Sequence, residues 1–539
     1  MRKRGAGSVW MILPLYLFTL IFVALPLLYV IALSFFTADG GYGVNWKFTL
    51  DNYKQILEPV YLQTFTGSFR LAITSTLIIC LVGYPFGYFM AKLSEGKKKL
   101  AMLFLMLPFW VNSLIRLYGW IIILQKKGLL NYLLMKLGII QEPLKILYSY
   151  PAIVIGMIYV LLPFMALSVY SSAEKLNWSL VEAARDLGAS RWKAFWSVTF
   201  KLTLPGLLSG VILTFIPSMG LFFIADILGG NKIVLVGSLI QEQMTRGNNW
   251  PFAADHSDDR TVQEDHQCEG TGGNRMKKNS KLSGLYLGIL FFLMYLPIGV
   301  VVVFSFNEAR LPVRFTGFSL KWYQELSHDR DLIQALKNSL ILAISSCGVS
   351  AVIGTLGAVG LSRIHWKTKG VMEYISILPL MIPEIILGMV LMAFFYMLNL
   401  PFGMLTLLIG HTVFCVPYIL MEVKARLVGM DPSLEEAARD LGAGSFRAFW
   451  DITLPLIMPA VISGSLLAFA MSMDDVVISI FVTGPRVSTL PIKVYTQMKT
   501  GVTPEINALC TMMLGVILLV LAVYLIMGKR GKGNKRDEQ

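Results

Sequence analysis

The sequence predicts an all-α polytopic membrane protein built from two repeated helical bundles. Of its 539 residues 55% are hydrophobic and only 15% are charged, whereas a soluble domain carries roughly 25% charged residues. Eleven apolar runs are long enough to cross a bilayer, which takes about 20 helical residues. One polar segment also recurs in the second half. Together these observations all but exclude a water-soluble enzyme.

The predicted spans form a group of five and a group of six. They lie at 11–34, 71–92, 100–124, 148–172 and 204–228, then at 283–305, 336–361, 372–396, 401–423, 457–481 and 507–527. Lysines 97–99 follow the second span, and Arg185 and Lys193 follow the fourth. Basic loops are cytoplasmic, so the N-terminus lies inside. The second half shows the same pattern, and the net charge of +14 therefore reflects topology rather than nucleic-acid binding.

An internal repeat relates the two halves. Residues 181–196 and 435–450 are identical at eleven of sixteen positions, 254 residues apart. Earlier in the chain the offset is 271, as between Pro108 and Pro379. The first half therefore holds about 17 additional residues, which we place in an outer loop around 128–147. A duplicated parallel unit predicts two similar bundles around a pseudo-twofold axis along the membrane normal.

The repeat divides the chain into three parts. These are a first unit at 1–254 whose sixth span is missing, a polar junction at 255–280, and a second unit at 281–539. Asp255–Arg260 is too polar to span. With five spans residue 255 lies outside, yet Lys277 should lie inside. Two explanations stay open: two neighbouring subunits joined after a reading-frame change, or a fusion with a rerouted linker.

The repeated segment lies between the fourth and fifth spans of each unit. Its Glu-Ala-Ala-Arg-Asp-Leu sequence favours a helix, which Gly188 or Gly442 ends. A single copy would be read as an ordinary loop helix. Two nearly identical copies at equivalent loops favour docking onto two copies of one partner.

These segments resemble the EAA loop of bacterial ABC-importer permeases. The matching residues are Glu182, Ala183, Ala184 and Gly188 in the first copy and Glu436, Ala437, Ala438 and Gly442 in the second. The second copy also has the motif's Ile452, Leu454 and Pro455, where the first has Val198, Phe200 and Lys201. The resemblance implies that both helices seat in ABC ATP-binding subunits. The sequence has no P-loop motif, so we expect ATP hydrolysis on a separate subunit and no cofactor bound by this chain.

Longer strings narrow the resemblance to spermidine/putrescine permeases. Leu107–Gly119 and Asn249–Phe252 look like the first permease of such importers, and Phe304–Asn307, Ser472–Val477 and Phe481–Pro485 like the second. This implies a channel component in the bacterial inner membrane that receives a polyamine from a periplasmic or lipid-anchored binding protein. A permease for another small solute, such as iron(III), and a stand-alone secondary transporter stay open as alternatives.

The ionisable residues that we identify within spans are mostly acidic. They are Arg116, Asp226, Glu384, Asp474 and Asp475. Such groups are costly in a bilayer and indicate function. A polyamine needs carboxylates for its ammonium groups and aromatic faces for its methylenes.

The predicted substrate path therefore comprises Asp474, Asp475, Glu384, Asp226, Trp110 and Tyr118. The structural alternatives are pairing of the Asp474/Asp475 pair with Arg116, a salt bridge for Glu384, a solvated position for Asp226, and packing for the aromatic residues. Asp474 and Asp475 align with Gly220 and Leu221, which predicts an asymmetric path. We read His256, His266 and Cys268 as linker residues and predict no metal site and no catalytic residue.

Overall fold

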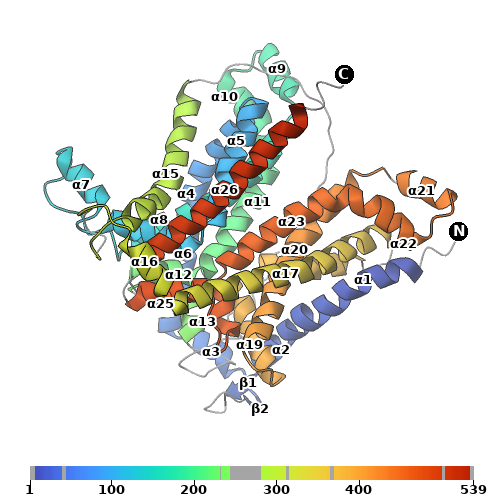
Figure 1. The fold of residues 1–539 in the computed structure, drawn as a ribbon, viewed down its shortest axis with the longest axis horizontal. Helices are drawn as coiled ribbons and strands as arrows, with labels where there is room; N and C mark the ends of the chain where they lie inside the picture. Colours follow the sequence, from blue (N-terminus) through green and yellow to red (C-terminus); the bar gives the residue numbers. More distant parts are fainter. Residues whose placement is uncertain are drawn as a thin grey trace.

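The computed structural model describes residues 6–38, 44–230, 232–242, 281–310, 315–364, 369–431, 433–500 and 504–533. It confirms the predicted all-α fold (Figure 1). The strands in the described part of the chain are β1 (Phe36–Ala38) and β2 (Val44–Phe48), which pair antiparallel. The junction at 255–280 lies outside the described residues, as do His256, His266 and Cys268.

The helices of the first half are α1 (Ala6–Thr19), η1 (Leu20–Ala24), α2 (Leu25–Leu33), α3 (Asp51–Ile56), α4 (Pro59–Ala91), α5 (Glu95–Met106), η2 (Leu107–Trp110), α6 (Ser113–Leu124), α7 (Leu129–Lys136), α8 (Tyr150–Glu174), α9 (Trp178–Asp186), α10 (Arg191–Ala194), η3 (Phe195–Thr199), α11 (Phe200–Gly220), α12 (Phe222–Gly229) and α13 (Val236–Glu242). Those of the second half are α15 (Lys281–Ser305), α16 (Lys321–His328), α17 (Arg330–Arg363), α18 (Lys369–Met381), α19 (Glu384–Met397), α20 (Met404–Val428), α21 (Ser433–Asp440), α22 (Ser445–Ala448), η5 (Phe449–Thr453), α23 (Leu454–Asp474), α24 (Val477–Val482), α25 (Leu490–Thr500) and α26 (Glu505–Gly533).

The number of spans differs from the eleven that the apolar runs predict. In the described part of the chain eight helical stretches are long and apolar enough to cross a membrane, or nine if α18 and α19, bent by 108°, count as one. The run at 100–124 is broken into α5, η2 and α6. Pro108 has no amide hydrogen to donate, and the Asn112 side chain accepts the Leu114 N–H at 3.0 Å to start a new helix. The run at 507–527 lies in α26, of which Glu505–Leu519 forms a shorter apolar helix.

Each unit has the same three-helix core. Helices α4, α8 and α11 pack together in the first, and α17, α20 and α23 in the second. The repeat also extends to single hydrogen bonds. The Ser68 hydroxyl accepts the Val236 N–H, and the Ser339 hydroxyl accepts the Leu490 N–H, both at 2.8 Å. These equivalent contacts support the duplication that the sequence predicts.

The first helix of each unit packs on the other unit. Helix α1 runs along α17 (Figure 1), and a Cβ atom on Gly360 would lie only 2.9 Å from the Cβ of Ile12. Glycine at this position therefore permits the close approach. Helix α15 packs on α6 and α4, and the Tyr159 hydroxyl donates to the Met294 carbonyl at 3.1 Å. The two units are interlocked by this exchange.

The additional residues of the first unit lie where the offset predicts them. Between α6 and α8 the chain forms α7 and its flanking turns, whereas residues 398–403 alone join α19 to α20. The buried Asn131 holds this loop together, because its side chain donates to the Leu144 carbonyl and accepts the Leu144 N–H, both at 2.9 Å. The prediction of an extra loop around 128–147 is confirmed.

Candidate functional site

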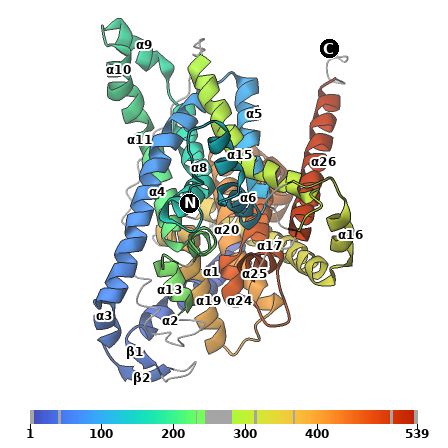
Figure 2. The same ribbon diagram turned by 90° about the vertical axis from the view of Figure 1, so that its left-hand side faces the viewer.

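The two segments that resemble the EAA loop form α9 and α21, which project from the ends of the bundles (Figure 1). Figure 2 shows the projection of α9 from a second side. Each helix ends at its glycine: the φ angles of Gly188 and Gly442 are +85° and +87°, a region that glycine adopts without strain. A backbone hydrogen bond of 3.0 Å closes the end of each helix. The Ala189 N–H donates to the Ala184 carbonyl, and the Ala443 N–H donates to the Ala438 carbonyl. The prediction of a glycine-terminated helix is confirmed in both copies.

The surface of both helices is open. Neither α9 nor α21 contains a buried residue, and Glu182 and Glu436 are exposed. The leucines that follow the helices, Leu187 and Leu441, are each 90% exposed. Leucine is costly to leave in water when no partner covers it. We call each helix with the leucine that follows it a knob. Both knobs therefore present the same exposed leucine, as an apolar tip, at equivalent places.

The two knobs continue into the spans with the same backbone. The π-helical turn η3 at Phe195–Thr199 precedes α11, and its counterpart η5 at Phe449–Thr453 precedes α23. The first copy departs from the family motif at Val198, Phe200 and Lys201. These substitutions leave the length and type of the turn unchanged.

The knobs are anchored to their cores by different chemistry. In the first unit the Lys92 ammonium lies 4.2 Å from the ring centre of Tyr88 and 5.0 Å from that of Trp178 on α9. In the second unit the Arg363 guanidinium is 2.8 Å from the Glu435 carboxylate on α21. A cation–π contact thus links α9 to α4, and an ion pair links α21 to α17.

An acidic cluster lies where the two units meet. Helix α23 ends at Asp474, whose carboxylate accepts the Ser113 N–H at the start of α6 and lies 3.7 Å from the Arg116 guanidinium. The Arg116 side chain is 3% exposed and also faces the ring of Tyr159 at 5.8 Å. The structure therefore shows for Asp474 the pairing that the sequence analysis kept as an alternative, and contact with cargo stays a prediction.

Asp475 is held by a buried polar network. Its carboxylate accepts the backbone N–H of Ile478 and Ser479 and so caps the start of α24. The fully buried His411 lies 3.4 Å from the same carboxylate. The other nitrogen of the His411 ring bonds the Ser472 hydroxyl at 2.7 Å. The break between α23 and α24 is therefore fixed by side chains from two helices.

Glu384 completes the cluster at a second helix break. It is the first residue of α19, directly after the bend that Pro383 introduces. Its carboxyl group lies within electrostatic range of Asp474 and Asp475, and it has no ion pair or hydrogen bond with another described side chain. Three carboxylates and one guanidinium thus converge between the units. Among the described residues no group of three or more His, Cys, Asp or Glu could hold a metal ion.

Asp226 lies elsewhere and is not solvated. Its side chain is only 8% exposed, and its carboxylate is 2.8 Å from the ammonium of Lys499 and 2.7 Å from the hydroxyl of Tyr495. The solvated position considered as an alternative is wrong, because α25 of the second unit places the cation of Lys499 against this buried carboxylate. Whether Asp226 contacts cargo stays a prediction.

Of the two aromatic residues in the predicted path, Tyr118 has a described side chain and Trp110 does not. The Trp110 backbone belongs to η2, but its side chain lies outside the described part of the structure. Tyr118 is 3% exposed and lies beside Asn507 of α26.

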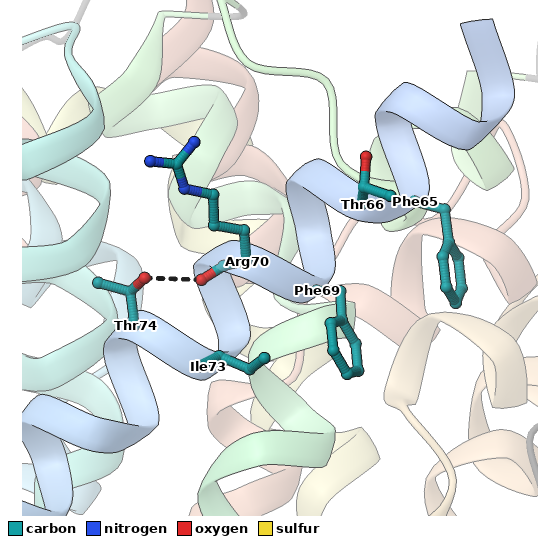
Figure 3. A pocket seen from close by; sticks show the side chains of 6 residues that line it. All are labelled: Phe65, Thr66, Phe69, Arg70, Ile73 and Thr74. Carbon is teal, nitrogen blue, oxygen red and sulfur yellow. Dashed lines mark hydrogen bonds between the residues drawn. The ribbon is translucent and has the colours of Figure 1, made fainter. Parts of the chain in front are cut away.

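A surface pocket of about 290 Å³ lies on α4 (Figure 3), and it involves none of the predicted residues. Its lining is Phe65, Thr66, Phe69, Arg70, Ile73 and Thr74. We assign this one-helix pocket no part in the site.

Among the residues of these networks, His411, Lys499 and Tyr495 were not identified from the sequence. His411 lies inside an apolar run, and the rule that singled out the intramembrane acids would have found it. Lys499 and Tyr495 follow no motif. They are identified only because α25 folds over Asp226, more than 260 residues away in sequence.

Comparison with known proteins identifies the family to which the chain belongs. Residues 83–254 and 350–528 both match the family described as binding-protein-dependent transport system inner membrane component. These two stretches are more than half of the chain, and the chain belongs to this family. It is a multi-pass inner-membrane protein. A more distant likeness is a solved bacterial ABC transporter that imports the acidic polysaccharide alginate, with 18% identity, a TM-score of 0.37, and coverage of 46% of this chain and 95% of the other.

The nearer relatives define the type of permease. The spermidine/putrescine transport system permease protein PotB of Escherichia coli K12 is 45% identical over 234 residues, which are 43% of this chain and 85% of PotB. PotC of the same strain is 40% identical over 257 residues, 48% of this chain and 97% of PotC. The chain is about twice as long as either relative. It joins two permease subunits of this type in one polypeptide, and these relatives are transport permeases rather than enzymes.

Proposed function

We propose that this chain is the transmembrane channel component of an ATP-driven importer of polyamines such as spermidine and putrescine. The observation that carries the proposal is the convergence of Glu384, Asp474 and Asp475 on the interface between the units. The Arg116 guanidinium pairs with Asp474 alone, and the carboxyl groups of the cluster outnumber it. The names of the relatives PotB and PotC support the same cargo.

The cluster suits a flexible polycation. A polyamine that leaves water loses the hydration of each ammonium group, and charge-assisted hydrogen bonds to carboxylates offset that loss. Glu384 is open to such a role because it has no described partner. Asp474 would exchange Arg116 for an ammonium group. Trp110 and Tyr118 remain candidate faces for the methylenes, and the burial of Tyr118 means that it would reach cargo only in another conformation.

The energy would come from outside the chain. In this proposal α9 and α21 seat in two copies of an ABC ATP-binding subunit, and ATP binding and hydrolysis there drive alternating access. A periplasmic or lipid-anchored binding protein delivers the polyamine on the opposite side. The chain itself binds no cofactor. The exposed tips at Leu187 and Leu441 support this docking, because both copies present the same surface.

Uptake of radiolabelled spermidine and putrescine tests the cargo. Cells without their own polyamine importer would express the chain with a matching ATPase and binding protein. We expect ATP-dependent uptake that unlabelled polyamine competes. The double variant Asp474→Asn/Asp475→Asn should lose uptake and still assemble. Asp51→Asn is the matched control, because that aspartate is 70% exposed beside Lys54. Normal uptake by the double variant would remove the pair from the path.

The docking role has a separate test. Glu182→Ala and Glu436→Ala should each weaken co-purification of the ATPase with the chain, because both residues lie on the exposed helices. Unchanged co-purification of both variants would contradict the role of α9 and α21.

A further inference from the structure

A lysine of the second unit forms an ion pair with a buried carboxylate of the first unit. The Lys499 ammonium on α25 lies 2.8 Å from the Asp226 carboxylate on α12 and 4.7 Å from the ring centre of Tyr495. The Tyr495 hydroxyl donates to the same carboxylate oxygen at 2.7 Å. Ser238 on α13 lies 3.4 Å from the other carboxylate oxygen. Groups from three short helices of the two units thus surround the Asp226 carboxylate.

The side chain of lysine is a chain of four methylene groups that carries a primary ammonium group at its end. A carboxylate, a hydroxyl and an aromatic face are the groups that recognise such a cation. We propose that Asp226 and Tyr495 form a binding site for a primary alkylammonium group, which Lys499 fills from within the chain until the cargo displaces it. This inference rests on the proposed polyamine cargo and adds a specific entry site to it.

The burial of the two partners favours exchange. The Asp226 side chain is 8% exposed, whereas that of Lys499 is 38% exposed. The carboxylate is therefore fixed inside the interface, and the ammonium group lies at its edge, where it can swing into water. A buried carboxylate without a cation is strongly disfavoured. Lys499 should consequently leave only when another cation takes its place, which would make opening depend on cargo.

The position of the site supports a role at the entrance. Tyr495 also packs against Phe222 at the start of α12, with ring centres 6.3 Å apart, and it hydrogen-bonds Gln241 of α13. Gln241 and Tyr495 are equivalent by the offset of 254, so the two units meet here across the pseudo-twofold axis. The α12/α25 contact lies at the ends of the spans opposite to the EAA-type loops. The residue equivalent to Asp226 is Ile480, so the repeat does not duplicate this site at the equivalent place.

Thiol labelling measures whether the ammonium group closes this contact. Ser238→Cys places a half-buried reporter beside Asp226, and a membrane-impermeant thiol reagent is added from outside. Removing the lysine side chain with Lys499→Ala should raise the labelling rate roughly tenfold or more, since the closed state loses its cation. Lys493→Ala is the matched control on the same helix: its partner Asp331 is 80% exposed, and labelling should not change.

Chemical rescue separates a binding site from a structural contact. In the Lys499→Ala background n-butylammonium should restore slow labelling, whereas the uncharged n-butanol should not. The rescue should disappear when Asp226→Asn is added. Equal protection by butanol, rescue that survives Asp226→Asn, or no effect of Lys499→Ala would each overturn the inference. If Lys499→Ala does not accumulate in the membrane, Lys499→Met removes the charge and keeps the methylenes, and its labelling should also rise.

The outcomes also separate this inference from the proposed function. If the unmodified chain takes up polyamine but butylammonium does not restore slow labelling of Lys499→Ala, the entry site is refuted and the proposed function is retained. Rescue by butylammonium without uptake of any polyamine would support the ammonium site and reject the cargo.

Discussion

The ion pair between Arg116 and Asp474 should stabilise the contact between the two units. We consider Arg116→Met, which removes the charge and keeps an apolar side chain of similar length. Loss of one partner from a buried ion pair costs about 3–5 kcal/mol. Here the N–O distance is 3.7 Å and the Asp474 side chain is 21% exposed. We therefore expect a smaller loss of unfolding free energy, about 2 kcal/mol.

The assay is unfolding of the purified chain in mixed micelles. Asp474→Asn and the double variant Arg116→Met/Asp474→Asn are measured in the same way. The double variant should recover part of the loss, because neither charge is then left alone, and the coupling energy should be about 1–2 kcal/mol. Arg447→Met is the control: its ion pair with Asp451 is exposed, and its removal should have no measurable effect. Additive effects of the two single variants would refute an energetic link between Arg116 and Asp474.

Three further perturbations follow from the geometry. Leu187→Asp and Leu441→Asp should each reduce the amount of co-purified ATPase, since each places a charge on an exposed apolar tip; retention of the partner by both would argue against docking there. Arg363→Gln should lower the uptake rate several-fold, because it releases α21 from α17 and leaves the pair of Glu435 with Arg439 in place. Normal uptake by Arg363→Gln would mean that this ion pair is not needed for transport. If the unmodified chain shows no uptake, an added apolar span before Met276 should restore it, and inactivity of both forms would point to another cargo.

Local patterns in the sequence determined much of the architecture. The apolar runs specify where helices cross the bilayer, because a helix satisfies its own backbone groups wherever it lies. The Glu-Ala-Ala segments and their glycines specify the ends of α9 and α21, since capping depends on residues within one turn. The change of offset between the halves placed the extra loop around Asn131. Breaks within spans were less visible, and η2 and the bend before Glu384 divided runs that composition alone treats as continuous.

The partners of the charged residues were decided by the tertiary structure. Composition identifies Asp226 and Asp474 as costly groups inside a membrane protein, but it cannot say which cation each one meets. Lys499 and Arg116 reach them only because helices of the two units pack against each other across the pseudo-twofold axis. Ion pairs act over a few ångströms, and the residues concerned are hundreds of positions apart in the chain. The sequence by itself therefore determined which residues need a partner, and only the packing of the two units decided which partner each one has.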